Sequence, residues 1–135
     1  MSAQSTDKGV NKATPALFAA ADNPQKMLSL GLDGLKSYIK TIGLYNNKAK
    51  NIMQLSQDLV DKFGGIVPRE RKELESLAGV GRKTANVFLN VIYDEPVIAV
   101  DTHVIRVSNR LDLSNSQNPL KIEEDLNNLL PDSYK

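Results

Sequence analysis

The sequence contains no cysteine and a single histidine, and these two shortages exclude several kinds of chemistry. Without cysteine the chain has no disulfide framework, no thiolate nucleophile and no cysteine-ligated metal. One histidine is too few for a zinc site built from histidines. We therefore expect no metal site in this chain, and any catalysis has to rest on lysine, carboxylate or hydroxyl groups.

Long hydrophobic runs are also missing. No apolar stretch approaches the roughly 20 residues that a membrane-spanning helix needs, and the N-terminal "MSAQSTDKGV" lacks the basic and then apolar build of a secretory signal. These features predict a cytoplasmic protein with no membrane partner. The net charge of +1 neither favours nor disfavours nucleic acid, because phosphate binding depends on how charges cluster on one surface.

What the sequence does have is apolar residues at helical spacing along most of its length. Its 135 residues, 41% of them hydrophobic and 24% charged, are ordinary for one compact globular domain. The clearest helix is predicted over 45–63, where an apolar stripe ends at two glycines. Only 96–100, "PVIAV", has β-branched character, and it is short enough to be the lead into a helix. We predict about eight short helices and one all-α domain over 1–135.

Capping residues and prolines mark several helix starts. Asn23 before Pro24, and Asn118 before Pro119, have the order of an N-cap followed by a proline in the first turn. Three further starts are predicted at Asp33 (helix over 34–42), at Pro68 (69–77) and at Asp101 or Thr102 (102–111).

The stretch "LAGVGRKT" joins two of these helices through a glycine-rich turn, which predicts a helix-hairpin-helix over about 70–92. Glycines at Gly79 and Gly81 permit positive φ values and leave the turn amides open to a ligand such as a phosphate oxygen. Glycines in ordinary helix–helix turns also cap helices, and the turn alone favours that simpler role. The Arg82–Lys83 pair that follows shifts the interpretation toward a sequence-independent contact with the DNA backbone.

Two blocks of the sequence, "LAGVGRKTANVFLNV" and "AVDTHVIRVSNRL", resemble the endonuclease III family of DNA glycosylases, within the helix-hairpin-helix superfamily that excises damaged bases. The stretches at 2–14 and 38–52 are similar to the family as well, so the resemblance covers nearly the whole chain. It implies an all-α, six-helix-barrel glycosylase domain that is incomplete at both ends. It also implies double-stranded DNA with a damaged base or an abasic site as the partner, and a location at the nucleoid.

The resemblance implies a bifunctional enzyme, a base-excision-repair DNA glycosylase with AP lyase activity that removes oxidised pyrimidines. Lys83 occupies the place of the family's nucleophilic lysine, and Asp101 occupies that of its catalytic aspartate. A neutral lysine amine can attack C1′, expel the base and leave a Schiff base, after which β-elimination breaks the strand. Taken alone, Lys83 is more simply a solvated lysine in the first turn of a helix, and Asp101 is more simply a helix N-cap. Their joint appearance in two matching blocks favours the catalytic pair.

The same resemblance assigns other positions to DNA contact. In the family a glutamine and a leucine fill the gap that an extruded nucleotide leaves in the base stack, and the matching residues here are Gln4 and Leu44. His103 could orient Asp101 or a phosphate, although its spacing to Arg106 favours a place on the polar face of a helix. The remaining candidates lie in and after the hairpin turn: Gly79, Val80, Gly81, Arg82 and Thr84.

The chain departs from the family's pattern at both ends. The family's segment before "SAQ", which forms a core helix, has no counterpart here, and neither has the C-terminal segment whose four cysteines hold an iron–sulfur cluster. No cofactor is therefore expected in this chain. The missing wall of the barrel predicts an apolar strip, on the helix after "SAQSTD" and on Ile52, Leu55 and Leu59, through which the chain would self-associate.

Two other functions remain open at this point. One is a related adenine glycosylase without lyase activity, which Lys83 and the "DTH" after Val100 both disfavour. The other is a catalytically weak or inactive fragment that binds DNA through its hairpin.

Overall fold

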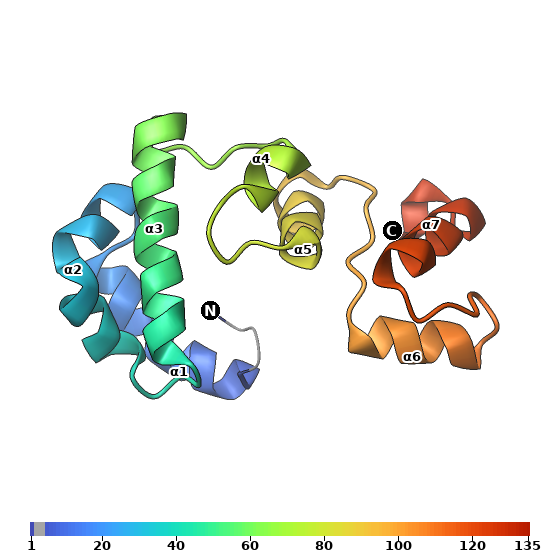
Figure 1. Ribbon diagram of the computed structural model, residues 1–135, viewed down its shortest axis with the longest axis horizontal. Coiled ribbons are helices and arrows are strands. Elements are labelled where there is room, and N and C mark those ends of the chain that lie inside the picture. Colours follow the sequence, from blue (N-terminus) through green and yellow to red (C-terminus); the bar gives the residue numbers. More distant parts are fainter. Residues whose placement is uncertain (2–4) are drawn as a thin grey trace. The chain divides into compact units, whose positions relative to one another are not determined.

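The structure is a computed structural model that describes residue 1 and residues 5–135, and this part of the chain contains helices and no strand (Figure 1). The predicted all-α fold class is confirmed. None of the helices in these ranges is long and apolar enough to cross a membrane. The helices are α1 (Asp7–Ala20), α2 (Pro24–Ile39), α3 (Tyr45–Phe63), α4 (Arg71–Glu75), α5 (Arg82–Tyr93), α6 (Thr102–Arg110), α7 (Pro119–Leu129) and the 3-10 helix η1 (Asp132–Tyr134).

The chain divides into two compact units. The first comprises Met1–Pro68 with Leu77–Gly79, and the second comprises Arg69–Ser76 with Val80–Lys135. Each unit buries its own clusters of hydrophobic side chains. The single domain over 1–135 stays a prediction.

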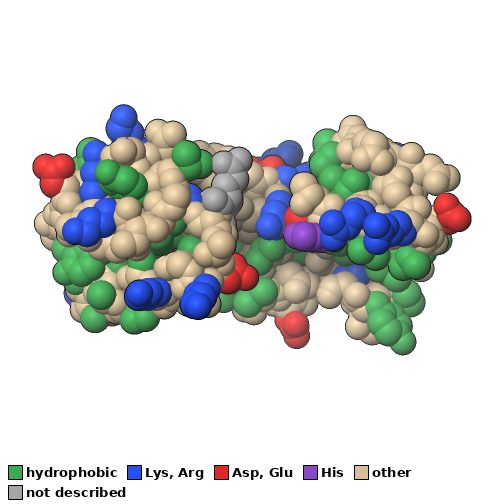
Figure 2. All heavy atoms as spheres, turned by 90° about the horizontal axis from the view of Figure 1, so that it is seen from below, with side chains coloured by type: hydrophobic (Ala, Val, Ile, Leu, Met, Phe, Trp, Pro, Cys, Tyr) green, Lys and Arg blue, Asp and Glu red, His purple; other side chains and the backbone are tan. Residues whose placement is uncertain are grey.

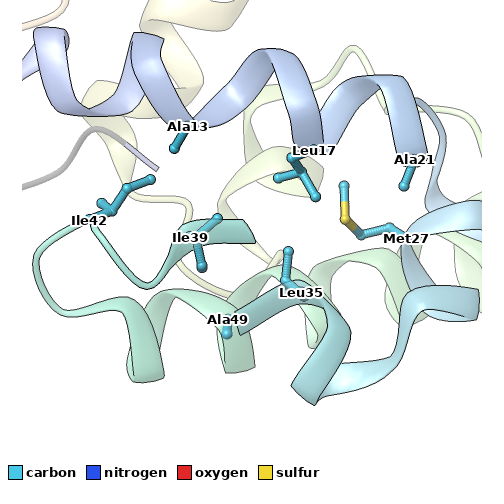
Figure 3. Close-up of a cluster of buried hydrophobic side chains, with 8 residues drawn as sticks. All are labelled: Ala13, Leu17, Ala21, Met27, Leu35, Ile39, Ile42 and Ala49. Carbon is cyan, nitrogen blue, oxygen red and sulfur yellow. The ribbon is translucent and has the colours of Figure 1, made fainter. Parts of the chain in front are cut away.

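The first unit is built from α1, α2 and α3. The predicted N-cap at Asn23 is confirmed, because its side chain accepts a hydrogen bond from the Lys26 amide at 2.8 Å. α3 begins and ends at the predicted residues, and Gly64 ends it in the left-handed conformation (φ 61°) that glycine reaches without strain. Side chains from all three helices point toward one another in the core (Figure 3), which consists of Ala13, Leu17, Ala21, Met27, Leu35, Ile39, Ile42 and Ala49.

One predicted helix start in the first unit is wrong. Asp33 does not cap a new helix, because it already lies inside the second helical segment of α2, which runs as far as Ile39. The break between the two helical segments lies at Gly31 instead, where φ is 72° and ψ is 170°. A residue without a Cβ adopts this conformation far more cheaply than an aspartate does, so the glycine decides where the helix is interrupted.

The helix predicted to open at Pro68 also starts later, at Arg71. The intervening Arg69 is held outside the helix by two contacts. Its Nε donates a hydrogen bond to Oε1 of Glu95 at 3.1 Å, and its guanidinium lies 4.7 Å from the ring centroid of Tyr93. Both partners lie beyond the predicted hairpin helix, so local sequence does not reveal them.

The second unit contains α4 to α7 and η1. Leu74 of α4 packs with Ala85 and Leu89 of α5 in one buried cluster. A second cluster joins Val100, just before α6, to Ile122 and Leu126 of α7. These clusters bring the starts of α5 and α6, which carry the predicted catalytic residues, into one compact unit.

The predicted exposed strip on α3 is largely covered. Leu59 is only 3% exposed, and Ile52 packs against the first unit's core. On α1, the other helix of the predicted strip, Phe18 is 49% exposed. Further exposed large apolar side chains lie on α5 to α7 or directly after α6: Val87, Val91, Ile92, Val107, Leu111, Leu120 and Leu129. Self-association through an apolar surface stays a prediction, but the stripe on α3 is not that surface.

Candidate active site and DNA interface

Lys83 is the second residue of α5, in the helical turn that directly follows the glycine-rich hairpin. It is exposed, whereas its neighbours Ala85 and Asn86 face the interior. In the part of the chain that the structure describes, no carboxylate lies within ion-pair distance of its amine. The amine of Lys83 is therefore free to meet a ligand from solvent.

Asp101 is the N-cap of α6, as predicted. Its Oδ1 accepts a hydrogen bond from the Val104 amide at 2.9 Å. This bond lowers the pKa of the Asp101 carboxyl, the His103 amide and the positive charges of Lys83 and His103 lower it further, and partial burial opposes them. Asp101 is therefore an anion at neutral pH, and it lies close enough to Lys83 for the charge of that lysine to lower its pKa.

The hairpin turn contains one glycine that the fold requires and one that it does not. Gly79 has a φ of 74°, and a Cβ there would lie 3.2 Å from the Cβ of Asn51. Gly81 has a φ of −95° and a ψ of 177°, which any residue adopts, and a Cβ there would meet nothing within 4 Å. The prediction that both glycines serve positive φ values is thus wrong for Gly81. The turn therefore does not require a glycine at 81, and the space that its Cβ would fill is open.

The N-terminus of α5 lacks a side-chain cap. Gly81 is its N-cap and supplies no side-chain acceptor, so the first amides of the helix point outward without a partner from a cap. Such amides and the positive end of the helix dipole favour an anion such as phosphate. Four other described helices satisfy these amides with side chains, namely those of Thr6, Asn23, Asp101 and Asn118.

We expect Gly81→Val to weaken binding of damaged and undamaged duplex DNA equally, by about tenfold each, because one phosphate contact is lost and no base contact changes. The fold should survive, since valine accepts extended backbone and its Cβ meets open space. Gly79→Val is the matched contrast, and it should lower the melting temperature because φ there is positive. Filter binding and thermal melting check this. Unchanged affinity of a folded Gly81→Val variant would remove the phosphate seat.

The other predicted hairpin positions differ in what their side chains do. Val80 packs against the buried cluster of α4 and α5, so only its backbone remains for DNA. Thr84 is exposed beside Lys83. Arg82 is occupied, because its Nε and Nη2 donate to the two carboxylate oxygens of Glu123 at 2.7 and 2.9 Å. A DNA contact by Arg82 stays a prediction, and the structure shows a protein partner for this guanidinium.

His103 lies on an exposed, cationic face of α6. Its Nδ1 is 3.0 Å from Nη2 of Arg106, one turn further along the helix. Figure 2 shows the histidine side chain (purple) beside side chains of Lys or Arg (blue). This arrangement agrees with the polar helix face that its spacing favours, and a DNA contact by His103 stays a prediction.

Leu44 stands out in the first unit. It is the N-cap of α3, it has a φ of 59° and a ψ of 30°, and it is 56% exposed. A bulky apolar residue in the left-handed region costs energy, and such strain persists chiefly where a function retains it. The matching prediction for Gln4 lies outside the described residues.

Sequence reasoning missed a set of polar residues buried near Lys83. Glu123 of α7 is 5% exposed and Asn86 of α5 is 1% exposed. A signal for Glu123 was present, because it directly follows Ile122 and precedes Leu126 by three residues, which places it on the buried face of α7. Its partner Arg82 lies 41 residues earlier, and spacing along one helix cannot indicate that contact.

This chain supplies no ligands for an iron–sulfur cluster. It contains no cysteine, and the described residues include no group of three or more His, Cys, Asp or Glu side chains that could hold a metal ion. The residues present therefore do not fit the cluster that the family resemblance implies, and no step below depends on one.

Residues 1–132 match the family model of the HhH-GPD superfamily base excision DNA repair proteins. The chain belongs to this superfamily. Over all 135 residues it is 57% identical to endonuclease III of Haemophilus influenzae and 50% identical to endonuclease III of Escherichia coli, and it covers 64% of each. The resemblance to the endonuclease III family that its motifs indicate is confirmed, and the chain spans less than two thirds of the length of these relatives.

Solved structures agree with the sequence relatives. A trapped covalent intermediate of endonuclease III with DNA, an estranged-adenine complex, superposes with a TM-score of 0.92 at 48% identity. The match covers 97% of this chain and 62% of that one. A thermostable thymine-DNA glycosylase matches with a TM-score of 0.84 at 26% identity, over 94% of this chain and 60% of that one. The predicted helix-hairpin-helix glycosylase fold is confirmed.

Proposed function

We propose that this chain carries the catalytic pair of a bifunctional DNA glycosylase, which removes oxidised pyrimidines and then cleaves the strand as an AP lyase. The observation that carries the proposal is the placement of an exposed Lys83, at the start of α5, near an ionised Asp101, at the start of α6. Membership of a base excision repair superfamily supports it. So does the capture of its structural relative, endonuclease III, as a covalent intermediate with DNA.

In the proposed reaction the amine of Lys83 first gives up a proton to water and then attacks C1′ of the damaged nucleotide. A bond forms between Nζ and C1′ while the bond from C1′ to the base breaks, and the base leaves with the electron pair and takes up a proton. Opening of the sugar gives a protonated Schiff base. Loss of a proton from C2′ then breaks the bond between C3′ and its oxygen, which releases the 3′ phosphate, and water hydrolyses the Schiff base to restore the lysine.

Asp101 has the properties of an electrostatic stabiliser for this reaction. Its carboxylate is held in place by the capping hydrogen bond from Val104, so it need not reorganise when positive charge develops on the sugar. Its negative charge favours that developing charge as the base departs. The same capping bond lowers the pKa of a carboxyl that is already ionised at neutral pH, so the negative charge also persists in mild acid.

The proposed partner is double-stranded DNA with a damaged base or an abasic site. The uncapped amides of α5 and the bare backbone at Gly81 are suited to one backbone phosphate, which positions the duplex without reading its sequence. Leu44 is proposed to enter the space of the extruded nucleotide, because an exposed apolar side chain can replace a base in the stack. With DNA as the proposed substrate and bacterial relatives, the proposed location is the cytoplasm, at the nucleoid.

Borohydride trapping on a duplex with one abasic site tests the proposal. Borohydride reduces a Schiff base to a stable amine, so a chain that works by a lysine nucleophile becomes covalently linked to the DNA. Salt-dependent binding with no covalent product would instead identify a DNA-binding fragment. Release of adenine without strand cleavage would identify an adenine glycosylase that lacks lyase activity.

We expect Leu44→Gly to slow removal of an oxidised pyrimidine by about tenfold, and to slow trapping on a ready-made abasic site less, because no base then has to leave the stack. Melting temperature should not fall, since relief of the left-handed strain offsets the entropy that glycine adds to the unfolded chain. Ile66→Gly is the control, because Ile66 is 74% exposed and lies in the loop after α3. Equal rates for wild type and Leu44→Gly would show that Leu44 has no part in extrusion.

A further inference from the structure

A buried carboxylate joins three helices of the second unit next to the proposed nucleophile. Glu123 of α7 receives two hydrogen bonds from Arg82 of α5, at 2.7 and 2.9 Å. Nη1 of Arg71, in α4, lies 3.7 Å from Oε1 of the same carboxylate. This Nη1 also donates to Oδ1 of the buried Asn86 at 3.4 Å, and Asn86 donates in turn to the carbonyl of Ile98 at 2.9 Å.

The network costs free energy that an apolar core would not cost. Glu123 is 5% exposed, and taking a carboxylate out of water carries a penalty that ion pairing commonly only offsets. Replacing such a buried pair with well-packed apolar residues is often neutral or stabilising. A contribution to stability is therefore a poor explanation for the network. A better one is that the network holds the helices it joins in a precise geometry.

The geometry of Arg82 links this precision to Lys83. Arg82 and Lys83 are the first two residues of α5, so whatever fixes Arg82 fixes the backbone turn that carries the lysine. The planar guanidinium engages both carboxylate oxygens, which constrains orientation as well as distance. The N-terminus of α5 has no side-chain cap of its own, and the Arg82–Glu123 pair is a contact that joins this first turn to α7.

We propose that Glu123, through Arg82, is a positioning residue that holds the first turn of α5, and thus the amine of Lys83, in its reactive place. The inference rests on the proposed function for its effect on rate. It also assigns Arg82 a role other than contact with a DNA phosphate.

Single-turnover trapping at saturating abasic DNA separates these two roles. Glu123→Gln keeps the size of the side chain and removes its charge, so the trapping rate should fall about ten- to a hundredfold while the dissociation constant stays within about twofold. Arg82→Met should cause a similar loss of rate, and Arg82→Lys a smaller one. The double variant should be no slower than the slower single variant, because both residues act through one contact. Glu124→Gln is the matched control, since that carboxylate is exposed and forms a surface ion pair with Lys121.

The opposite pattern would overturn the proposal. If Arg82→Met weakens DNA binding and lowers its salt dependence by about one phosphate contact, while Glu123→Gln traps at the wild-type rate, then Arg82 is a phosphate contact and Glu123 is structural. Should Glu123→Gln fail to fold, Arg82→Lys and Arg82→Met decide between the same two outcomes. A positioning role lowers the trapping rate at saturating DNA in both variants, whereas a phosphate contact lowers the DNA affinity of Arg82→Met and leaves the trapping rate unchanged.

Hydrogen exchange tests the positioning independently of activity, so it also applies if the wild-type chain is not trapped and the proposed function fails. The Ala85 amide donates to the Gly81 carbonyl at 3.0 Å, and it reports on the first turn of α5. In Glu123→Gln this amide should exchange about tenfold faster relative to the amides of α1, whereas Glu124→Gln should leave it unchanged. Equal exchange in both variants would show that Glu123 does not anchor this turn.

Discussion

Lys83→Ala should abolish borohydride trapping on an abasic duplex, with a loss of at least about a thousandfold in rate, because no other group replaces a nucleophile. The substitution should leave the fold intact. Lys83 is exposed, it makes no ion pair with any residue of the described ranges, and alanine is the best helix former for the first turn of α5. The measurement is the yield of covalent complex with time, run beside a binding assay.

Two variants make this result specific to the nucleophile. Lys83→Arg keeps the positive charge, and with it most of the DNA affinity, but a guanidinium stays protonated and cannot form the Schiff base. Lys72→Ala removes an exposed lysine from α4, in the same unit, and should trap at the wild-type rate. Persistent trapping by Lys83→Arg would place the nucleophile at another amine of the chain.

The sequence predicts local structure well wherever the signal is local. The bounds of α3 follow from a continuous apolar stripe that ends at two glycines, and the cap at Asn23 follows from a side chain that bonds an amide three residues away. Both signals come from residues of one helix and of the turn that flanks it. Asp101 was predictable as a cap for the same reason, and its place in a family motif added the catalytic interpretation.

Prediction failed where a residue's role depends on a partner far along the chain or on exact backbone angles. The sequence indicates a free cation at Arg82, beside Lys83, because its partner Glu123 lies 41 residues later, on α7. Gly81 reads like Gly79, although only Gly79 occupies the left-handed region. Val91 is apolar, yet it is 71% exposed, because it lies outside the face of α5 that buries Ala85, Asn86 and Leu89. Periodicity identifies a face but not which partner covers it.

Asp101 is the residue whose substitution separates catalysis from folding most cleanly. Asparagine is as good an N-cap as aspartate, so Asp101→Asn should keep the hydrogen bond from the Val104 amide and the start of α6. It loses only the negative charge. We expect removal of an oxidised base to slow by about a hundredfold or more, because charge on the sugar is no longer stabilised, while DNA remains bound. Asp101→Ala should match this loss of rate and also lower the melting temperature, since the cap is gone.

Acid unfolding supplies the second half of the test. The pKa of Asp101 is lowered from its ordinary value of 3.8, chiefly by the Val104 amide, so the folded state favours the ionised carboxylate more than the unfolded state does. Its contribution to stability is therefore fully present above that ordinary value and disappears as the pH falls through the lowered one. The difference in unfolding free energy between wild type and Asp101→Asn should be constant near neutral pH and shift in favour of Asp101→Asn in acid.

The rate of base removal decides whether Asp101 takes part in catalysis. If Asp101→Asn removes the base at the wild-type rate near neutral pH, where the carboxylate is ionised, Asp101 is a helix cap and no more.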